Sequence, residues 1–122
     1  MLDAEHRLLR GEDFSTAVRT GARRGSRRLV VHYCAGESGD ESPALVGVVV
    51  PKKQIPLATH RNRVKRRIRG VMAARLARLE PGSRVVIRGL AGAEGASSAE
   101  LGRDVDLLLA RCRELARQGR KR

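Results

Sequence analysis

The sequence is poor in aromatic residues: its 122 residues include no Trp, one Phe and one Tyr. A core built on large rings is therefore excluded, and Val, Leu, Ile and Ala must fill it. Cysteine is also scarce, and Cys34 and Cys112 have neither CxxC spacing nor a secretory context. We expect both thiols to be reduced and to pack as small core residues, without a disulfide or a bound metal.

Long apolar runs are missing as well. No stretch approaches the roughly 18 residues that a membrane-spanning helix needs, and the N-terminus has no apolar signal-peptide segment. The length suits a single hydrophobic core. We therefore expect one domain over residues 1–122 and a cytoplasmic location.

The chain also lacks a recognisable catalytic constellation. His6, His32 and His60 do not have the spacing of a zinc motif. The Gly- and Ala-rich residues 89–98 lack the Lys-Ser/Thr ending of a phosphate-binding loop, and their composition predicts a flexible linker. We expect no catalytic residue and no metal ligand in this chain.

Positive charge is what the sequence has in excess. Lys and Arg number 26 against 13 Asp and Glu, a formal net charge of +13. Residues 42–79 carry ten of these cations and no acid. This distribution predicts a polyanionic partner, either nucleic acid or an anionic membrane. The predominance of Arg over Lys favours nucleic acid, because guanidinium groups bind phosphate through two hydrogen bonds and stack on bases.

The hydrophobic pattern predicts helices and strands that form a two-layer α/β sandwich. A short helix is expected to begin near Gly11 and to end at Gly21. Thr59 stands where it could cap a later helix, and residues 118–122 are expected to form a frayed basic tail. The remaining elements are strands at 22–35, 45–50 and 83–88 and helices at 61–79 and 99–116.

The expected helix from Arg61 has two different faces at 100° per residue. One arc is apolar and can pack on a sheet through Val64, Ile68 and Met72. Cations at i, i+4 spacing on the other arc repel one another by a few tenths of a kcal/mol per pair (~0.2–0.5), and no nearby acid relieves this. The pattern therefore indicates an external anion. The cationic arc holds Asn62, Arg63, Lys65, Arg66, Arg67 and Arg69.

The segment from Ile55 to Arg69 resembles the signature of the ribonuclease P protein family. That signature is an apolar residue, two residues, Ala, two residues, and then Arg-Asn-basic-apolar-Lys-Arg-x-apolar-basic, and every position fits. The resemblance extends along the chain through three further segments. These are Glu12-Asp13-Phe14 with Gly21, the run from Leu45 to Lys53, and the run from Val85 to Arg88.

From the pattern we expect a mixed sheet of about four strands with three helices, in the order α-β-β-(β)-α-β-α. The resemblance adds an unusual left-handed βαβ crossover, which no hydrophobic pattern could indicate. In this family the Arg-Asn-Arg helix binds the catalytic RNA subunit. The RNA-subunit-binding residues implied here are Arg61, Asn62, Arg63, Lys65, Arg66, Arg67, Arg69, Lys52 and Lys53.

The family also has a cleft, between its first helix and the sheet, that binds the single-stranded 5′ leader of precursor tRNA. Its first aromatic residue is matched here by Phe14, whereas a second aromatic position on the same helix is Val18. Because this leaves little aromatic surface for base stacking, we expect charge to contribute more to leader binding. The leader-binding residues implied are Phe14, Val18, Arg23, Arg27, Arg28, and either His32 or Tyr33 as the strand aromatic.

The function that the resemblance implies is removal of the 5′ leader to give the mature tRNA end. Catalysis belongs to the RNA subunit, which holds the Mg²⁺ ions, and the protein alone is inactive and needs no organic cofactor. The expected partners are ribonuclease P RNA and precursor tRNA, with no membrane and no DNA. A ribosomal protein or another structured-RNA-binding protein is the alternative. Pro51 and Pro56 depart from the family pattern and leave the shape of the basic loop open.

Overall fold

The computed structural model describes residues 21–36 and 39–120, with side chains up to residue 118. The short helix expected to end at Gly21 lies outside the described residues. The described elements are β1 (Ala22–Gly25), β2 (Leu29–Cys34), β3 (Leu45–Val49), α2 (Ala58–Ala73), η2 (Leu76–Arg78), β4 (Arg84–Gly89), η3 (Ala91–Ala93) and α3 (Ser98–Arg120).

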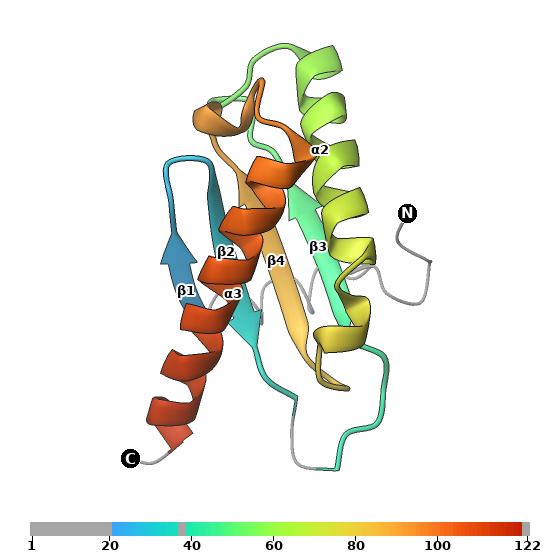
Figure 1. The fold of residues 1–122 in the computed structure, drawn as a ribbon, viewed down its shortest axis with the longest axis vertical. Coiled ribbons are helices and arrows are strands. Elements are labelled where there is room, and N and C mark those ends of the chain that lie inside the picture. The colour runs from blue at the N-terminus through green and yellow to red at the C-terminus, as the bar shows by residue number, and fades with distance from the viewer. Residues whose placement is uncertain (1–20, 37–38, 121–122) are drawn as a thin grey trace.

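The four strands form one mixed sheet in the order β1-β2-β4-β3. Strand β2 pairs antiparallel with both β1 and β4, whereas β3 and β4 are parallel. Helices α2 and α3 cover the same face of the sheet (Figure 1). The predicted two-layer sandwich with a mixed sheet of four strands is confirmed.

The β3–α2–β4 connection joins two neighbouring parallel strands. In Figure 1 both strands run upward, α2 lies in front of the sheet, and β4 lies to the left of β3. The crossover is therefore left-handed, although about 98% of such connections are right-handed. The structure thus has the handedness that the family resemblance implies.

The core lies between the two helices and the sheet, and it is built almost entirely from aliphatic side chains. Alternate residues of β2 and β4 point toward the helices, and Leu29, Val31 and Ile87 are fully buried among them. The predicted apolar face of α2 is confirmed, since Val64 and Ile68 are buried. The core side chains of α3 are Leu101, Val105, Leu108, Leu109 and Cys112.

Cys34 and Cys112 are thiols that are not joined by a disulfide. The Cys112 side chain is fully buried, and its Sγ lies 3.5 Å from the Val31 carbonyl oxygen. Burial raises the pKa of the Cys112 thiol to about 11, so the thiol stays protonated and packs as a small apolar group. Cys34 is only half-buried at the end of β2, so core packing is confirmed for Cys112 alone.

A tight turn divides the strand predicted over residues 22–35 into β1 and β2, which gives the optional third strand of the predicted order. The Ser26 N–H donates to the Leu29 carbonyl at 2.8 Å. The Ser26 Oγ accepts hydrogen bonds from the N–H groups of Arg28 and Leu29 at 3.2 and 3.3 Å. A Gly-Ser pair at 25–26 is a turn signal that the strand prediction overlooked. As a result, β1 is an edge strand.

Helix α2 begins at Ala58, three residues before the predicted start. Its N-cap is Leu57, which makes no side-chain capping bond, so the predicted cap by Thr59 is wrong. The Arg61 N–H already donates to the Leu57 carbonyl at 3.0 Å, which closes the first helical turn.

Helix α2 also ends at Ala73 rather than near residue 79. The Arg75 Nη1 donates to the Val71 carbonyl at 2.9 Å and so satisfies one of the carbonyls that the last turn leaves unpaired. The chain then tightens into the short η2 helix, after which Leu79 is buried in the core.

Residues 89–98, predicted to be a flexible linker, contain η3 and pack against the sheet. Ala93 and Ala96 are buried. Gly92 lies so close to the β1–β2 turn that an added Cβ would come within 2.5 Å of the Arg27 carbonyl oxygen. Only glycine can approach the neighbouring backbone this closely without moving it.

Helix α3 is longer than the predicted 99–116. Its backbone is helical from Ser98 through Arg120, so residues 118–120 of the predicted frayed tail belong to the helix. Over the described ranges, neither α2 nor α3 is long and apolar enough to cross a membrane.

A capping box starts α3, and its removal should destabilise the protein. The Glu100 N–H donates to Ser97 Oγ, and the Ser97 N–H donates to Glu100 Oε1, both at 3.1 Å.

We expect Ser97→Ala to lower the free energy of unfolding by about 0.5–2 kcal/mol in urea denaturation, whereas Ser97→Asp keeps an acceptor and loses less. An alanine variant as stable as the wild type would contradict a capping role. Hydrogen bonds from the Ser97 N–H and hydroxyl to the Glu100 carboxylate, followed by the charge of Arg28, hold the pKa of Glu100 below its usual value. The stability that this carboxylate contributes is therefore present above the usual pKa and is lost as pH falls through the lowered pKa.

Candidate nucleic-acid interface

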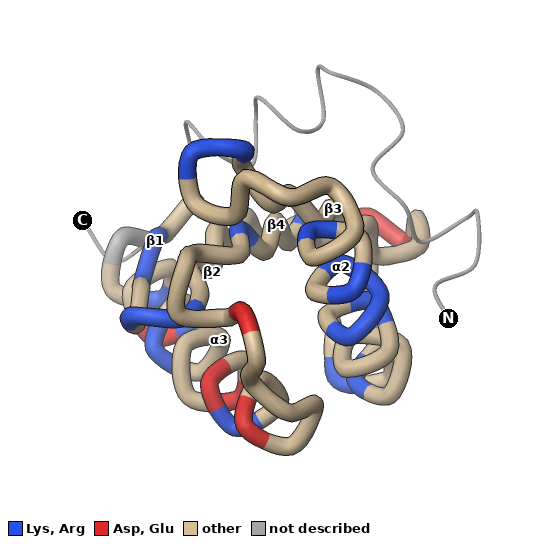
Figure 2. The backbone as a smooth tube through the Cα atoms, turned by 90° about the horizontal axis from the view of Figure 1, so that it is seen from above, with Lys and Arg blue, Asp and Glu red and all other residues tan. Residues whose placement is uncertain are grey.

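Helix α2 presents a cationic face on the side away from the core. Arg63 and Arg66 are exposed, Lys65 and Arg69 are half-buried, and exposed Asn62 lies among them. Figure 2 shows Lys and Arg along α2 and around β1, while Asp and Glu gather on α3 between them. The cationic face predicted from helical periodicity is confirmed as a geometric feature.

Two acids that lie near α2 are paired with residues other than Arg63 and Arg66. Asp106 of α3 binds Arg75 through two bonds of 2.6 and 3.1 Å, and it also lies 3.4 Å from Arg78. Glu94 pairs with His60. Within the described part of the chain, Arg63 and Arg66 have neither an acid partner nor a hydrogen-bonded carbonyl. Their guanidinium groups are therefore available to bind phosphate.

Two predicted RNA-binding arginines of α2 also hold the neighbouring loops. Arg61 Nη1 donates to the carbonyls of Ile55 and Pro56 at 3.0 and 2.6 Å. Arg67 Nη1 donates to the Ala96 carbonyl at 3.0 Å. Each guanidinium has five N–H donors, so donors remain for RNA after these bonds are made. These two residues tie α2 to the loops that flank it.

The basic loop before α2 is a tight turn with its lysines at the tip. The N–H groups of Gln54 and Ile55 donate to the Pro51 carbonyl at 3.0 and 3.1 Å, and Ile55 is buried. Gln54 Oε1 accepts a hydrogen bond from the Ala91 N–H at 3.0 Å. Lys52 and Lys53 are exposed, as expected for phosphate-binding residues.

The sheet face opposite the helices carries a second set of polar groups. Arg23 pairs with His32 across β1 and β2, and Arg88 of β4 also lies near the imidazole. His32 is only 4% exposed, and neither ring nitrogen has a hydrogen-bond partner among the described residues. Burial, followed by the charges of Arg88 and Arg23, lowers the pKa of His32, so its imidazole is neutral at pH 7.

Arg88 was missing from the predicted site. Strand β4 holds two charged residues, Arg84 and Arg88, and both share a face with Val86. The alternation of the strand places Arg88 on that face, but its proximity to His32 depends on the pairing of β2 with β4, which the pattern does not contain.

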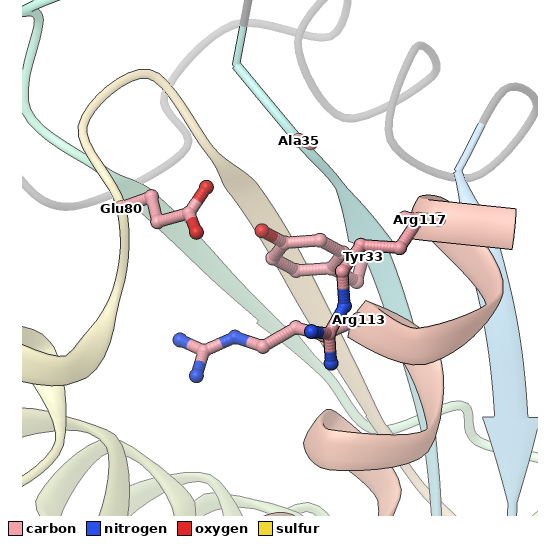
Figure 3. A pocket seen from close by; sticks show the side chains of 6 residues that line it. Tyr33, Ala35, Glu80, Arg113 and Arg117 are labelled. Carbon is pink, nitrogen blue, oxygen red and sulfur yellow. The ribbon is translucent and has the colours of Figure 1, made fainter. Parts of the chain in front are cut away.

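Tyr33 lies on the other face of β2 from His32. Its side chain is 2% exposed and lines a hollow of about 250 Å³ with Glu80, Arg113 and Arg117 (Figure 3). Of the two strand residues that the sequence left open, only His32 is on the face opposite α2 and α3.

The remaining predicted leader-binding residues have different surroundings. Arg27 is exposed at the β1–β2 turn. Arg28 is bound to α3 by Glu100 at 2.8 Å and Asp104 at 3.4 Å. Phe14 and Val18 lie outside the described residues.

Residues 21–36 and 39–120 contain no group of three or more His, Cys, Asp or Glu side chains that could hold a metal ion. The described part of the chain therefore does not fit a metal centre of its own.

A mixed α/β sandwich with an acid-free cationic helix defines a basic protein of the RNA-binding class. The ribonuclease P family model matches residues 2–113. The ribonuclease P protein component of Streptomyces griseus is 47% identical over 91% of this chain and 94% of its own length, and that of Mycobacterium sp. strain KMS is 42% identical over 93% and 94%.

Solved structures show the same fold. The RNase P protein of Staphylococcus aureus has a TM-score of 0.72 at 21% identity, covering 86% of this chain and 93% of its own. That of Thermotoga maritima has a TM-score of 0.68 at 22% identity, covering 84% and 94%. The chain belongs to the ribonuclease P protein family. It is a component of an endoribonuclease that processes the 5′ end of tRNA, and its partner is the ribonuclease P RNA.

Proposed function

We propose that the two surfaces of the protein bind two different RNA segments in the cytoplasm. The cationic face of α2, with Lys52 and Lys53, docks on the RNA subunit. The sheet face with Arg23, His32 and Arg88 holds the single-stranded 5′ leader of precursor tRNA. The acid-free cationic face of α2 is the observation that carries this proposal, because such a face requires an anionic partner.

The chemistry of the second surface suits a single strand. Arg23 and Arg88 supply positive charge for phosphates, and the buried, neutral His32 ring lies beside them without adding a charge of its own. With Phe14 as the aromatic residue of the proposed cleft, each stacked base would add about 1–3 kcal/mol. Binding of the leader by the protein then adds to binding of the tRNA body by the RNA subunit.

We propose that the Mg²⁺ ions of the reaction are held mainly by the RNA subunit, where they would activate water and stabilise the leaving oxygen. The protein contributes binding energy instead. Its cations neutralise phosphates near the substrate and thereby lower the Mg²⁺ concentration that the complex needs.

Reconstitution tests this proposal. The full chain is mixed with a bacterial ribonuclease P RNA, and cleavage of a 5′-labelled precursor tRNA is followed at low Mg²⁺. We expect the protein alone to be inactive, the RNA alone to be slow, and the mixture to release the leader at the mature 5′ end. The mixture should also bind precursor tRNA more tightly than mature tRNA, because only the precursor carries a leader.

Two results would contradict it. If the mixture of protein and a matched RNA subunit cleaves precursor tRNA no faster than the RNA alone, docking of the α2 face on the RNA subunit is contradicted. Equal affinity for precursor and mature tRNA would exclude leader binding while leaving RNA-subunit binding intact.

A further inference from the structure

The edge strand β1 carries two consecutive arginines that point to opposite faces of the sheet. Arg23 pairs with His32 and shares its face, whereas Arg24 pairs with Val31, whose side chain is in the core on the helix side. Both arginines are exposed. No described strand pairs with the outer edge of β1, so positive charge is continuous from one face to the other around this edge.

On the helix side, Arg24 lies against the C-terminal half of α3. Burial raises the pKa of the Cys112 thiol, whereas a backbone hydrogen bond from Arg24, followed by the Arg24 charge, lowers it. Arg24, Arg111, Leu115 and Gln118 line an open hollow of about 360 Å³, together with Glu114. The hollow offers guanidinium groups for phosphate and an aliphatic side chain and an amide for a base.

The charge balance of this hollow is positive. Its one acid, Glu114, is already paired with Arg117 at 2.9 Å. The other acids near the hairpin, Glu100 and Asp104, bind Arg28. Among the described residues, Arg24 and Arg111 have no acid partner. A strip of free cations thus continues from the leader face, around the edge of the sheet, to α3.

We infer that the leader-binding track extends around β1, so that the part of a long 5′ leader distant from the cleavage site binds Arg24 and Arg111. This inference rests on the proposed leader site, because Arg23 is the point at which the two surfaces meet. A single strand can turn around a strand edge, whereas a stiff duplex cannot follow it. The substrates that use this extension are precursor tRNAs whose leaders are long enough to pass β1.

The test compares leader lengths on the reconstituted holoenzyme. Precursor tRNAs with leaders lengthened one nucleotide at a time are titrated against wild type, Arg111→Glu and Arg24→Glu. The readout is the affinity for the longest leader divided by that for the shortest within each variant, so that a uniform loss of affinity cancels. The control is Arg103→Glu, an equal charge change at an exposed position of α3 that does not line the hollow.

We expect this ratio to be about three- to tenfold for wild type and for Arg103→Glu, and to fall close to one for Arg111→Glu and Arg24→Glu. An Arg111→Glu ratio equal to that of wild type would overturn the inference. So would equal losses in Arg111→Glu and Arg103→Glu, because these would indicate long-range charge alone. Failure of the leader site itself gives a different result: precursor and mature tRNA then bind equally even with the shortest leader.

Discussion

Reversing Arg63 and Arg66 to Glu together should weaken binding of the RNA subunit by about a hundredfold, equivalent to about 2.8 kcal/mol. Both side chains are exposed on the cationic face of α2, and neither has a partner among the described residues. The change removes two phosphate contacts and places two carboxylates against the RNA backbone. Because both positions are opposite the buried face, the fold should be retained.

Filter binding over a range of salt concentrations measures this effect. Each lost phosphate contact reduces the slope of log K against log salt by about one, so the double variant should have a slope smaller by about two. Arg103→Glu with Arg117→Glu on α3 is the charge-matched control and should retain more of the affinity and the slope. Equal losses in both double variants would show that net charge, rather than the α2 face, determines binding.

Shortening the side chain on the other face of α2 should instead destabilise the protein. Ile68 is fully buried, and its Cδ1 lies 3.6 Å from the position that a Cβ on Gly89 of β4 would occupy. We expect Ile68→Ala to lower the free energy of unfolding by about 2–5 kcal/mol, since it removes apolar contacts and leaves a cavity beneath the helix.

Urea denaturation of the free protein measures this loss, and Ile68→Val, expected to cost about 0.5–1.5 kcal/mol, is the graded control. If Ile68→Ala had the stability of the wild type, α2 would not be held on the sheet by this face. The RNA affinity of the alanine variant should fall only to the extent that the folded fraction falls. This result would show that the buried face of the helix contributes to stability and not directly to RNA binding.

The two faces of α2 could be predicted from sequence because helical periodicity assigns each residue to an arc without reference to the rest of the chain. The ends of the helix could not be predicted in this way. They depend on Arg61 reaching back to the Ile55 and Pro56 carbonyls and on Arg75 reaching the Val71 carbonyl. These hydrogen bonds from long side chains do not affect the hydrophobic periodicity of the sequence, so the pattern could not indicate them.

The sheet face was harder to predict for a related reason. Alternation shows that His32 and Tyr33 point in opposite directions, but which of them faces the helices depends on strand pairing. The same pairing brings Arg88 near His32. The left-handed crossover follows from how β3, α2 and β4 are arranged in three dimensions, so the family resemblance indicated it and the hydrophobic pattern did not.

The absence of acids along α2 has a consequence for the stability of the protein without its RNA. Like charges that repel in the free chain are relieved when RNA phosphates neutralise them, and any partner that binds only the folded state stabilises that state. Assembly and folding are therefore thermodynamically linked. The protein bound to its RNA should therefore unfold at a higher denaturant concentration than the same protein without RNA.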